Sequence, residues 1–256
     1  MIQFIIFCAG AATRLGSLLA NEPKHLVDIR GHHILGKIVD NIRVYFDEAQ
    51  IHIIINPYSI KAFEKFLENQ NDRRISIVLQ RQPNGTRNAL KDYYIHNYNN
   101  GNDICAVYGD TIVYREQFFC YLNKNRPLKP VISVSPFTLF DIDATSVGVQ
   151  GDRATHFAHG KETDQSFRWA GRIYLPVDCK LLHDLVASTL SHPDLNSRRT
   201  EQSIGTFLGE FGNNHEIDVV REKDLVNLNT PNDYGRLVSD WRRYFNDLSP
   251  SEVRED

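Results

Sequence analysis

Short apolar runs alternate with amphipathic stretches through the first half of the chain, and this alternation restricts the possible folds most. The apolar runs are too short for helices and span residues 3–8, 51–55, 75–79, 104–108 and 131–135. Apolar residues at helical spacing between them predict helices over residues 34–46, 59–69, 87–96 and 115–123. Strands that are apolar throughout and alternate with helices predict an α/β fold with a parallel sheet covered on both faces.

The second half of the chain follows a different pattern. From about residue 137 to 176 the strand-like pieces become shorter and have polar breaks, which predicts a small antiparallel insertion. Beyond it we expect helices at about 178–190 and 200–211, strands at 217–220 and 225–228, and a terminal helix over roughly 231–246. The Thr-Pro pair at the start of this last helix suits its N-cap and first helical position.

Composition excludes several classes of protein. A formal net charge of −3 argues against a general binder of nucleic acid or of acidic membranes. No apolar run approaches the 18 or so residues of a membrane span, and the N-terminus lacks the basic region and cleavage site of a signal peptide. The four cysteines are widely spaced and resemble buried thiols in a reducing compartment, so we expect a cytoplasmic protein.

A loop of small residues follows the first predicted strand and is the first candidate site. Residues 8–16 (CAGAATRLG) let backbone N–H groups approach an anion closely. Arg14 can hold two phosphate oxygens at once, and Lys24 supplies a compact positive charge. Both cations would stabilise charge on a leaving pyrophosphate. The loop residues expected to bind the phosphates are Ala9, Gly10, Ala11 and Thr13.

Further candidates follow later strands, because open α/β sheets bind ligands beyond the carboxyl ends of their strands. Gln80 follows the third run, and its side-chain amide can donate and accept hydrogen bonds at the same time. The fourth run ends at Gly109-Asp110, where a carboxylate is well placed to hold Mg²⁺. The histidines, by contrast, have no third ligand at zinc spacing, so we interpret them as packed or solvated.

Four motifs, in this order, resemble those of the sugar-phosphate nucleotidyltransferases. The family's G-x-G-[ST]-R-L, followed by P-K, matches at Gly10, Thr13, Arg14, Leu15, Pro23 and Lys24. Its Q-x-x-x-x-G-T-x-x-A-[LM] stretch matches at Gln80, Gly85, Thr86 and Ala89. Its G-D pair matches Gly109-Asp110, and its D-x-[GN]-T-P-E-D-[LY] ending is similar to residues 227–234.

The resemblance implies a role for each matching residue. Gln80, Gly85 and Thr86 would meet the nucleotide base, with Gly109 nearby, and Asp110 would bind the catalytic metal. A second metal ligand would be Asn227 or Asn229, and the sequence does not choose between them. The acceptor would lie against Gly148, Lys161 and Gly171, in the least similar part of the chain.

Three departures from the family pattern put full activity in question. Ala12 replaces the second glycine of the phosphate loop, and an alanine is strained if that position needs a positive φ. Neutral amides at 227 and 229 replace a carboxylate, which weakens Mg²⁺ binding. The E-K-P stretch for the sugar phosphate is missing, and His159-Gly160-Lys161-Glu162 stands in its place.

The resemblance implies one doubly wound α/β domain of the nucleotide-diphospho-sugar transferase type, with a mixed, mostly parallel sheet, over residues 1–247 and a polar tail, 248–256. Residues 1–136 would bind the nucleotide, 137–230 the acceptor, and 231–247 would form the terminal helix. The expected enzyme uses Mg²⁺ to transfer a nucleotide from an NTP to a sugar 1-phosphate, with release of pyrophosphate. A homo-oligomer is one expectation for its assembly, whereas nucleobase, acceptor and pathway stay open.

Two alternatives share these motifs, and two other classes do not. A cytidylyltransferase acting on a non-sugar phosphate would carry all four motifs, and a catalytically inactive nucleotide-binding homologue fits the three departures. A Rossmann dehydrogenase is disfavoured, because Ala12 and Leu15 stand where G-x-G-x-x-G needs glycines. A P-loop kinase is excluded, because the chain has no G-K-[ST].

Overall fold

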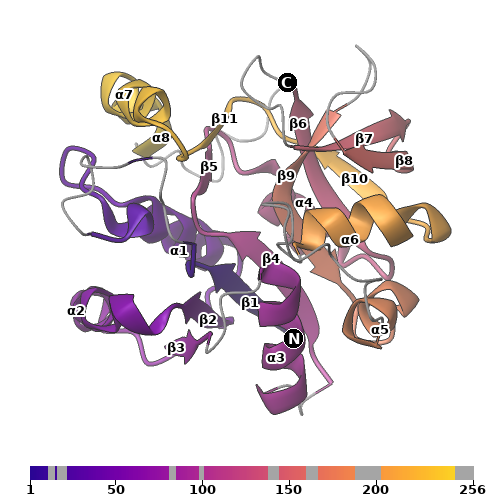
Figure 1. Cartoon of the computed structure of the whole chain (residues 1–256), viewed down its shortest axis with the longest axis horizontal. Helices are drawn as coiled ribbons and strands as arrows, with labels where there is room; N and C mark the ends of the chain where they lie inside the picture. Colours follow the sequence, from indigo (N-terminus) through magenta and orange to yellow (C-terminus); the bar gives the residue numbers. More distant parts are fainter. Residues whose placement is uncertain are drawn as a thin grey trace, which may run out of the picture. The chain divides into compact units, whose positions relative to one another are not determined.

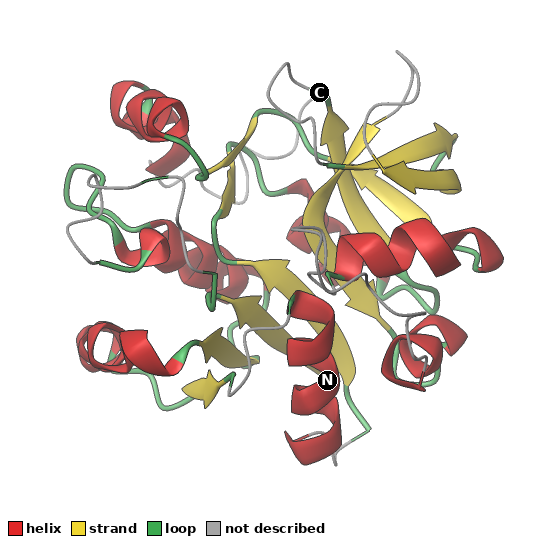
Figure 2. Cartoon of the chain, in the orientation of Figure 1, coloured by secondary structure: helices red, strands yellow, loops and turns green. Residues whose placement is uncertain are grey.

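The computed structural model describes residues 1–10, 15, 22–80, 85–97, 101–137, 144–159, 167–187 and 203–245. Helices and strands alternate along them, giving an α/β structure with a mixed sheet (Figures 1 and 2). The strands are β1 (Ile2–Phe7), β2 (Gln50–Ile55), β3 (Ile75–Leu79), β4 (Asp103–Tyr108), β5 (Thr111–Val113), β6 (Val131–Pro136), β7 (Thr145–Gln150), β8 (Arg153–His159), β9 (Phe167–Leu175), β10 (Asp218–Arg221) and β11 (Leu225–Asn227). The α-helices are α1 (Ile34–Tyr45), α2 (Ile60–Gln70), α3 (Thr86–Asn97), α4 (Gln117–Asn125), α5 (Lys180–Ala187), α6 (Ile204–Phe211), α7 (Pro231–Ser239) and α8 (Trp241–Phe245). Short 3₁₀ helices are η2 (Lys24–Leu26), η3 (Pro57–Ser59) and η4 (Gly212–Asn214).

The strands of the described residues form a large sheet and a small one. The large sheet has the order β3-β2-β1-β4-β9-β6-β10-β8-β7, and β5 pairs with β11 in the small sheet. The pairs β2–β3 and β6–β10 are parallel, whereas β6–β9, β7–β8 and β7–β9 are antiparallel. The antiparallel pairs therefore involve the region in which the sequence pattern shortens.

The chain divides into two compact units. Unit 1 comprises Met1–Ile5, Gln82–Ala106 and Pro127–Arg221, and unit 2 comprises Ile6–Arg81, Val107–Arg126 and Glu222–Asp256. In unit 1, α6 packs against β7, β8 and α3, and α3 also contacts α5. In unit 2, α1 packs against α4, β5 and η2. The residues of α1 buried there are Ile34, Leu35, Ile38, Val39 and Ile42.

Burial of these apolar faces accounts for most of the observed elements. The apolar spacing of α1 fits the helical period of 3.6 residues, so one stripe of the helix faces the core. The interior strands β1 and β4 are apolar over most of their length, as expected for strands covered on both faces. Among the described residues no helix combines the length and apolar character needed to cross a bilayer.

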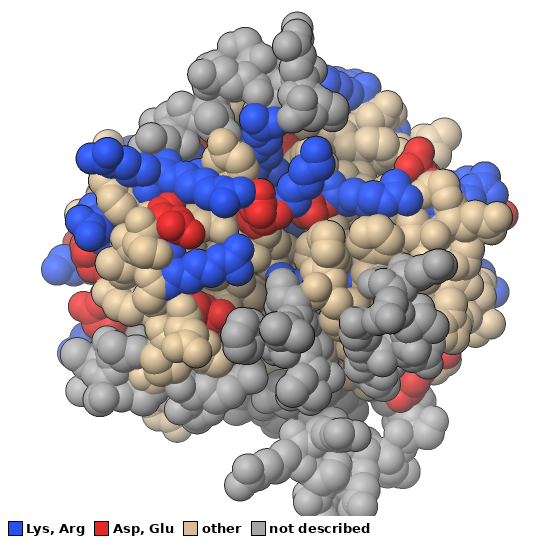
Figure 3. Space-filling model, turned by 90° about the horizontal axis from the view of Figure 1, so that it is seen from above, with Lys and Arg blue, Asp and Glu red and all other residues tan. Residues whose placement is uncertain are grey.

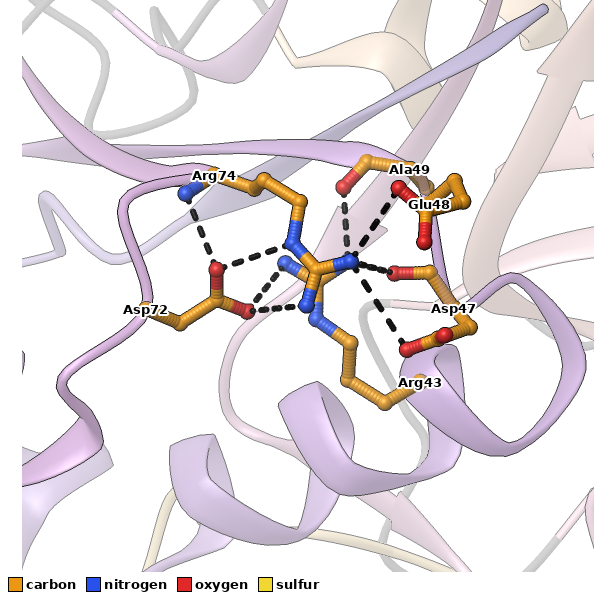
Figure 4. A network of polar contacts seen from close by, with 6 residues as sticks. All are labelled: Arg43, Asp47, Glu48, Ala49, Asp72 and Arg74. Atoms are coloured by element: carbon orange, nitrogen blue, oxygen red, sulfur yellow. Dashed lines mark hydrogen bonds and ion pairs between the residues drawn. The ribbon is translucent and has the colours of Figure 1, made fainter.

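A network of charged groups in unit 2 joins the end of α1 to the segment before β3 (Figure 4). Asp72 accepts hydrogen bonds from the backbone N and the Nε of Arg74, both at 2.9 Å, and these bonds lower the pKa of its carboxyl. Arg43 Nη2 lies 2.8 Å from the same carboxylate, while its Nη1 donates to the carbonyls of Asp47 and Ala49. The network thus holds the start of β2 beside the start of β3.

The C-terminal segment differs from the expected single helix over 231–246. It forms α7 and α8, which are separated at Asp240, the C-cap of α7. Ser239 Oγ bonds back to the carbonyl of Arg236 at 3.0 Å, and serine and aspartate are poor helix formers because their side chains compete for backbone groups. The break lets Trp241 and Phe245 both stack on the ring of His32, with centroid separations of 5.6 and 5.2 Å.

Candidate functional site

Three segments of unit 2 bring a cation, a carboxylate and an amide together. Lys24 donates hydrogen bonds from its ammonium group to Asp110 Oδ2 and, at 3.0 Å, to Asn229 Oδ1. Lys24 lies in η2, Asp110 follows β4, and Asn229 follows β11. Lys24 is 7 % exposed, so its positive charge is almost entirely shielded from water. The charge is therefore stabilised by Asp110 and Asn229.

Asp110 reaches this position because Gly109 allows a close approach of backbones. The Gly109 N–H donates to the carbonyl of Phe7 at 3.0 Å. A Cβ at Gly109 would lie 3.0 Å from that same oxygen and closer still to the sulfur of Cys8, so any side chain there would force a shift. The carbonyl of Asp110 also accepts a hydrogen bond from the N–H of Leu228 at 2.8 Å. This bond holds the turn at Gly109-Asp110 against the segment that follows β11.

The electrostatics of the cluster keep Asp110 ionised. Burial raises the pKa of its carboxyl, but the charge of Lys24 and hydrogen bonds from Lys24 and Thr111 outweigh burial and lower the pKa overall. Thr111 Oγ1 donates to Asp110 Oδ1 at 3.3 Å. A buried carboxylate that stays anionic is the kind of ligand that a hard divalent cation requires.

The two candidate asparagines have different surroundings. Asn227 is the last residue of β11 and pairs with Thr111 of β5. Its Oδ1 is buried and, among the described residues, has no hydrogen-bond partner. Asn229, whose Oδ1 accepts from Lys24, is held through its N–H by Asp233 Oδ2 at 3.0 Å.

The side-chain oxygens of Asp110 and Asn227 are of the kind that suits a magnesium ion. Asp110 offers a carboxylate, and the unpartnered Oδ1 of Asn227 offers a neutral oxygen, both of which are hard donors. No group of three His, Cys, Asp or Glu that could hold a metal exists in the described part of the chain. A metal here would therefore have few protein ligands and would need oxygens from a substrate or water, as Mg²⁺ commonly does.

Part of the predicted phosphate loop lies beside this cluster. A Cβ built on Gly10 would be 3.9 Å from Lys24 Cε. Gly10, which follows β1, and Lys24 are therefore neighbours. The carbonyl of Ala9 accepts from Asn56 Nδ2 at 3.4 Å. The predicted phosphate ligands Ala11, Thr13 and Arg14, together with Ala12, lie outside the described residues.

The predicted base-binding residues are divided between the two units. Gln80 belongs to unit 2, where it is buried directly after β3 and its N–H donates to the carbonyl of Ile55 at 2.8 Å. Gly85 and Thr86 belong to unit 1, at the start of α3. Thr86 Oγ1 accepts from the N–H of Ile204 at 3.1 Å and thereby caps a donor at the start of α6, a structural role that sequence reasoning did not anticipate.

The predicted acceptor residues that the structure describes lie on the antiparallel strands of unit 1. Gly148 lies in β7 opposite His156 of β8. Gly171 is buried in β9 with a φ of +75°, at the point where the register between β6 and β9 shifts, so it occupies a β-bulge that favours glycine. Lys161 lies outside the described residues.

Sequence reasoning missed three residues around Asp110. His25 is 2 % exposed, and burial together with the charge of Lys24 lowers its pKa to about 3, so the imidazole is neutral. Cys8 is buried against Gly109, and burial raises the pKa of its thiol. Thr111 binds the carboxylate directly. His25 directly follows the Pro-Lys pair and Thr111 directly follows Gly-Asp. This position next to a motif is the sequence feature that could have identified them.

Curated relatives match only part of this chain. The chain is 34 % identical to the bifunctional protein GlmU of Methanococcus maripaludis (strain C7) over 86 residues, which are 34 % of this chain and 20 % of that protein. It is 28 % identical to the bifunctional protein GlmU of Methanococcus vannielii over 119 residues, 46 % of this chain and 27 % of that protein. The matches thus span between a fifth and just over a quarter of these relatives' length.

Solved structures resemble the chain over nearly its whole length. A Bacillus anthracis protein assigned as a glucose-1-phosphate thymidylyltransferase, crystallised with sucrose, has a TM-score of 0.78 at 15 % identity, covering 97 % of this chain and 98 % of that one. A UDP-glucose pyrophosphorylase complexed with UDP-glucose has a TM-score of 0.72 at 14 % identity, with coverages of 95 % and 99 %. The inositol-1-phosphate CTP transferase of T. maritima has a TM-score of 0.70 at 15 % identity, with coverages of 94 % and 96 %.

At such identities these likenesses show the fold alone: the chain shares the α/β fold of these solved structures. The family assignment rests on a separate match, in which the family described as Nucleotidyl transferase covers residues 3–150, more than half of the 256 residues. This range includes Lys24, Gln80 and Asp110. The chain belongs to the nucleotidyl transferase family.

Proposed function

We propose that this protein transfers a nucleoside monophosphate from an NTP to a sugar 1-phosphate, giving an NDP-sugar and pyrophosphate. The observation that carries the proposal is the convergence of Lys24, Asp110 and Asn229 on one buried cluster in a member of the nucleotidyl transferase family. A polyphosphate substrate needs a cation and a carboxylate that can bind a metal side by side, and Lys24 and Asp110 are proposed to fill these two roles.

The proposed chemistry is an in-line substitution at the α-phosphorus of the NTP. An oxygen of the acceptor phosphate forms the new bond to this phosphorus, and the bond to the β-phosphate oxygen breaks, so that pyrophosphate leaves. No general base is required, because the acceptor phosphate is already anionic at pH 7. Catalysis then consists of positioning and charge neutralisation, to which Lys24 contributes near the leaving group, together with Arg14.

Lys24 would change partners when substrate binds. In the structure its ammonium group is bound to Asp110 and Asn229. A triphosphate carries more negative charge than a single carboxylate, so we propose that Lys24 turns toward it and releases Asp110 for Mg²⁺. The bound Mg²⁺ would neutralise charge on the phosphates in the transition state.

The two asparagines take different roles in this proposal. Asn227, whose oxygen is buried and unpartnered among the described residues, would join Asp110 as a metal ligand. Asn229 would hold Lys24 in place, since its Oδ1 already accepts from that ammonium group. The remaining proposed contacts follow the family resemblance: the nucleotide at Ala9, Gly10, Ala11, Thr13, Gln80, Gly85, Thr86 and Gly109, and the acceptor at Gly148, Lys161 and Gly171.

A second candidate function is cytidylyl transfer to a non-sugar phosphate. It is favoured by the fold that the chain shares with the inositol-1-phosphate CTP transferase. A panel of NTPs and phosphorylated acceptors, read by pyrophosphate release, separates the two. Turnover with CTP and a non-sugar acceptor alone would replace the sugar proposal, and nucleotide binding without any turnover would indicate an inactive homologue.

Substitution at the cluster tests the proposed site. We expect Asp110→Asn and Lys24→Ala to lower the rate of pyrophosphate release by about 100-fold or more, the typical loss when a charge-stabilising group is removed. Lys65→Ala and Asp178→Ala, which remove exposed charges elsewhere, serve as matched controls and should retain the wild-type rate. Wild-type turnover by folded Asp110→Asn, with its circular dichroism spectrum unchanged, would refute the assignment.

A further inference from the structure

Unit 2 contains a cationic hollow that the proposed reaction does not use. Its volume is about 430 Å³, which falls within the range of roughly 300–1,000 Å³ typical of small-molecule sites. In the view from above, lysine and arginine side chains, with acidic side chains among them, lie on the left, where Figure 1 places α7 and α8, and also across the rest of this face (Figure 3). The hollow is lined by Arg30, Ser239, Asp240, Trp241, Arg242 and Arg243.

Positive charge is in excess in this lining. Three guanidinium groups face one carboxylate, that of Asp240. Arg243 has a further partner, since it forms an ion pair with Asp224, but the balance stays positive when this second carboxylate is counted. The guanidinium of Arg242 lies 5.6 Å from the centroid of the Trp241 ring and has no carboxylate partner in the described ranges. Its hydrogen-bond donors are therefore available to a ligand.

The walls of the hollow are held by contacts that do not involve a ligand. The ring of His32 stacks on both Trp241 and Phe245, which fixes α8 against the turn that carries Arg30. Arg30 Nε also donates to the carbonyl of Val238 at the end of α7, at 3.3 Å. The two separate chain segments that supply the arginines are thus joined before anything binds, which lowers the cost of ordering them around a ligand.

Arg30 has an unusual backbone conformation for an arginine. Arg30 has a φ of +54° in the tight turn between the bridged residues Ile29 and His32, where a non-glycine residue is strained by about 1–2 kcal/mol. Asparagine or glycine would occupy this position more easily. Strained residues are common where ligands bind, and here the strained residue is one of the three arginines of the hollow.

We propose that this hollow binds a phosphate-bearing small molecule. Guanidinium groups form paired, charge-assisted hydrogen bonds to phosphate oxygens, and Arg30, Arg242 and Arg243 supply several such donors from two directions. The lining shares no residue with the cluster of Lys24, Asp110 and Asn229, so the site is separate from the proposed reaction centre and does not depend on the proposed function.

Calorimetric titration with inorganic pyrophosphate tests the proposal in four full-length proteins. These are the wild type, Lys24→Ala, the pocket variant Lys24→Ala/Arg30→Ala/Arg242→Ala, and Arg73→Ala/Arg153→Ala, a control that removes two exposed arginines from other places. Lys24→Ala disables the proposed reaction centre. Pyrophosphate binding that remains in this variant is therefore attributed to the hollow. The fluorescence of Trp241 in Lys24→Ala provides a second, local readout, because this ring lines the hollow.

We expect saturable binding in the wild type, Lys24→Ala and the control, with a change in tryptophan fluorescence in Lys24→Ala. In the pocket variant, which also carries Lys24→Ala, affinity should fall by about tenfold or more. Equal affinity with and without the pocket arginines would overturn the proposal, and so would the loss of all binding in Lys24→Ala alone. A parallel titration with a single-stranded oligonucleotide checks the ligand class, and tighter binding of the oligonucleotide would replace the small-molecule proposal by a nucleic-acid surface.

Discussion

Asp110 and Lys24 form a buried ion pair whose two members depend on each other. Removing either one leaves an uncompensated charge in a nearly dry environment, which typically costs about 3–5 kcal/mol. Such a pair contributes little net stability, since desolvation cancels much of the attraction. The pair is thus not explained by stability, and it agrees with the proposed role of both charges in substrate and metal binding.

Asn227 and Asn229 allow the metal ligand and the lysine partner to be separated by experiment. We predict that Asn227→Ala weakens Mn²⁺ binding by about tenfold or more in the presence of NTP, because a metal ligand is lost. Asn229→Ala should leave Mn²⁺ affinity unchanged and weaken NTP binding, because Lys24 loses the partner that positions it. Electron paramagnetic resonance of Mn²⁺ and calorimetry of the NTP measure the two effects.

A carboxylate introduced at position 227 provides a control for the predicted role of Asn227 in Mn²⁺ binding. Asn227→Asp adds a carboxylate where the family pattern has one, so it should bind Mn²⁺ more tightly than the wild type. The opposite pattern, with Mn²⁺ affinity lost in Asn229→Ala and kept in Asn227→Ala, would show that the two roles are exchanged.

At this scale the sequence predicts which residues carry charge but not how they pair. The motifs single out Lys24, Asp110 and the two asparagines, and the structure brings Lys24, Asp110 and Asn229 into direct contact. The motifs do not show that Lys24 binds Asp110 itself. The two residues are 86 positions apart in the chain, so their contact depends on how the backbone turns near each of them. The neutral state of His25 could not be predicted either, since it follows from burial and from the nearby ammonium group.

Among the elements, those with a strong apolar pattern are predictable. The sequence predicts a strand at 75–79 and a helix at 34–46, and the structure has β3 at Ile75–Leu79 and α1 at Ile34–Tyr45. The three-residue strand β5 has too short a pattern to be recognised, and it exists because it pairs with β11. The division between α7 and α8 was missed because the apolar pattern continues through Asp240, while local side-chain bonds end the helix.

The pair β2–β3 gives a prediction for pH dependence. His52 lies opposite Ser76 in the parallel ladder, its Nδ1 is 2.8 Å from Ser76 Oγ, and burial lowers its pKa. Since the unfolded chain then binds a proton more readily than the folded one, His52 costs stability as the pH falls below its unfolded pKa of about 6.5. The loss for one group cannot exceed about 1.4 kcal/mol per pH unit.

Urea denaturation at pH 7 and at pH 5 measures this effect. The free energy of unfolding should fall less between these two values in His52→Gln than in the wild type, because the substituted side chain takes up no proton. An equal or larger decrease in His52→Gln would contradict the interpretation that a neutral, half-buried His52 contributes to the acid sensitivity of the sheet.

For the whole molecule, fold and family are better determined than substrate. Solved structures share the fold over more than nine-tenths of the chain at about 15 % identity, so the fold persists where most residues have changed. The region expected to bind the acceptor is where the family motifs are weakest, and Lys161 lies outside the described residues. Specificity depends on such individual contacts, which is why the sequence predicts nucleotidyl transfer more firmly than the acceptor.

The most direct test of the central claim is a crystal structure with Mn²⁺ and a non-hydrolysable NTP analogue. We predict that Lys24 Nζ leaves Asp110 and contacts the phosphates, and that the anomalous signal of Mn²⁺ lies within bonding distance of the carboxylate of Asp110 and of Asn227 Oδ1. A triphosphate and metal bound elsewhere, with the ion pair between Lys24 and Asp110 intact, would contradict the account.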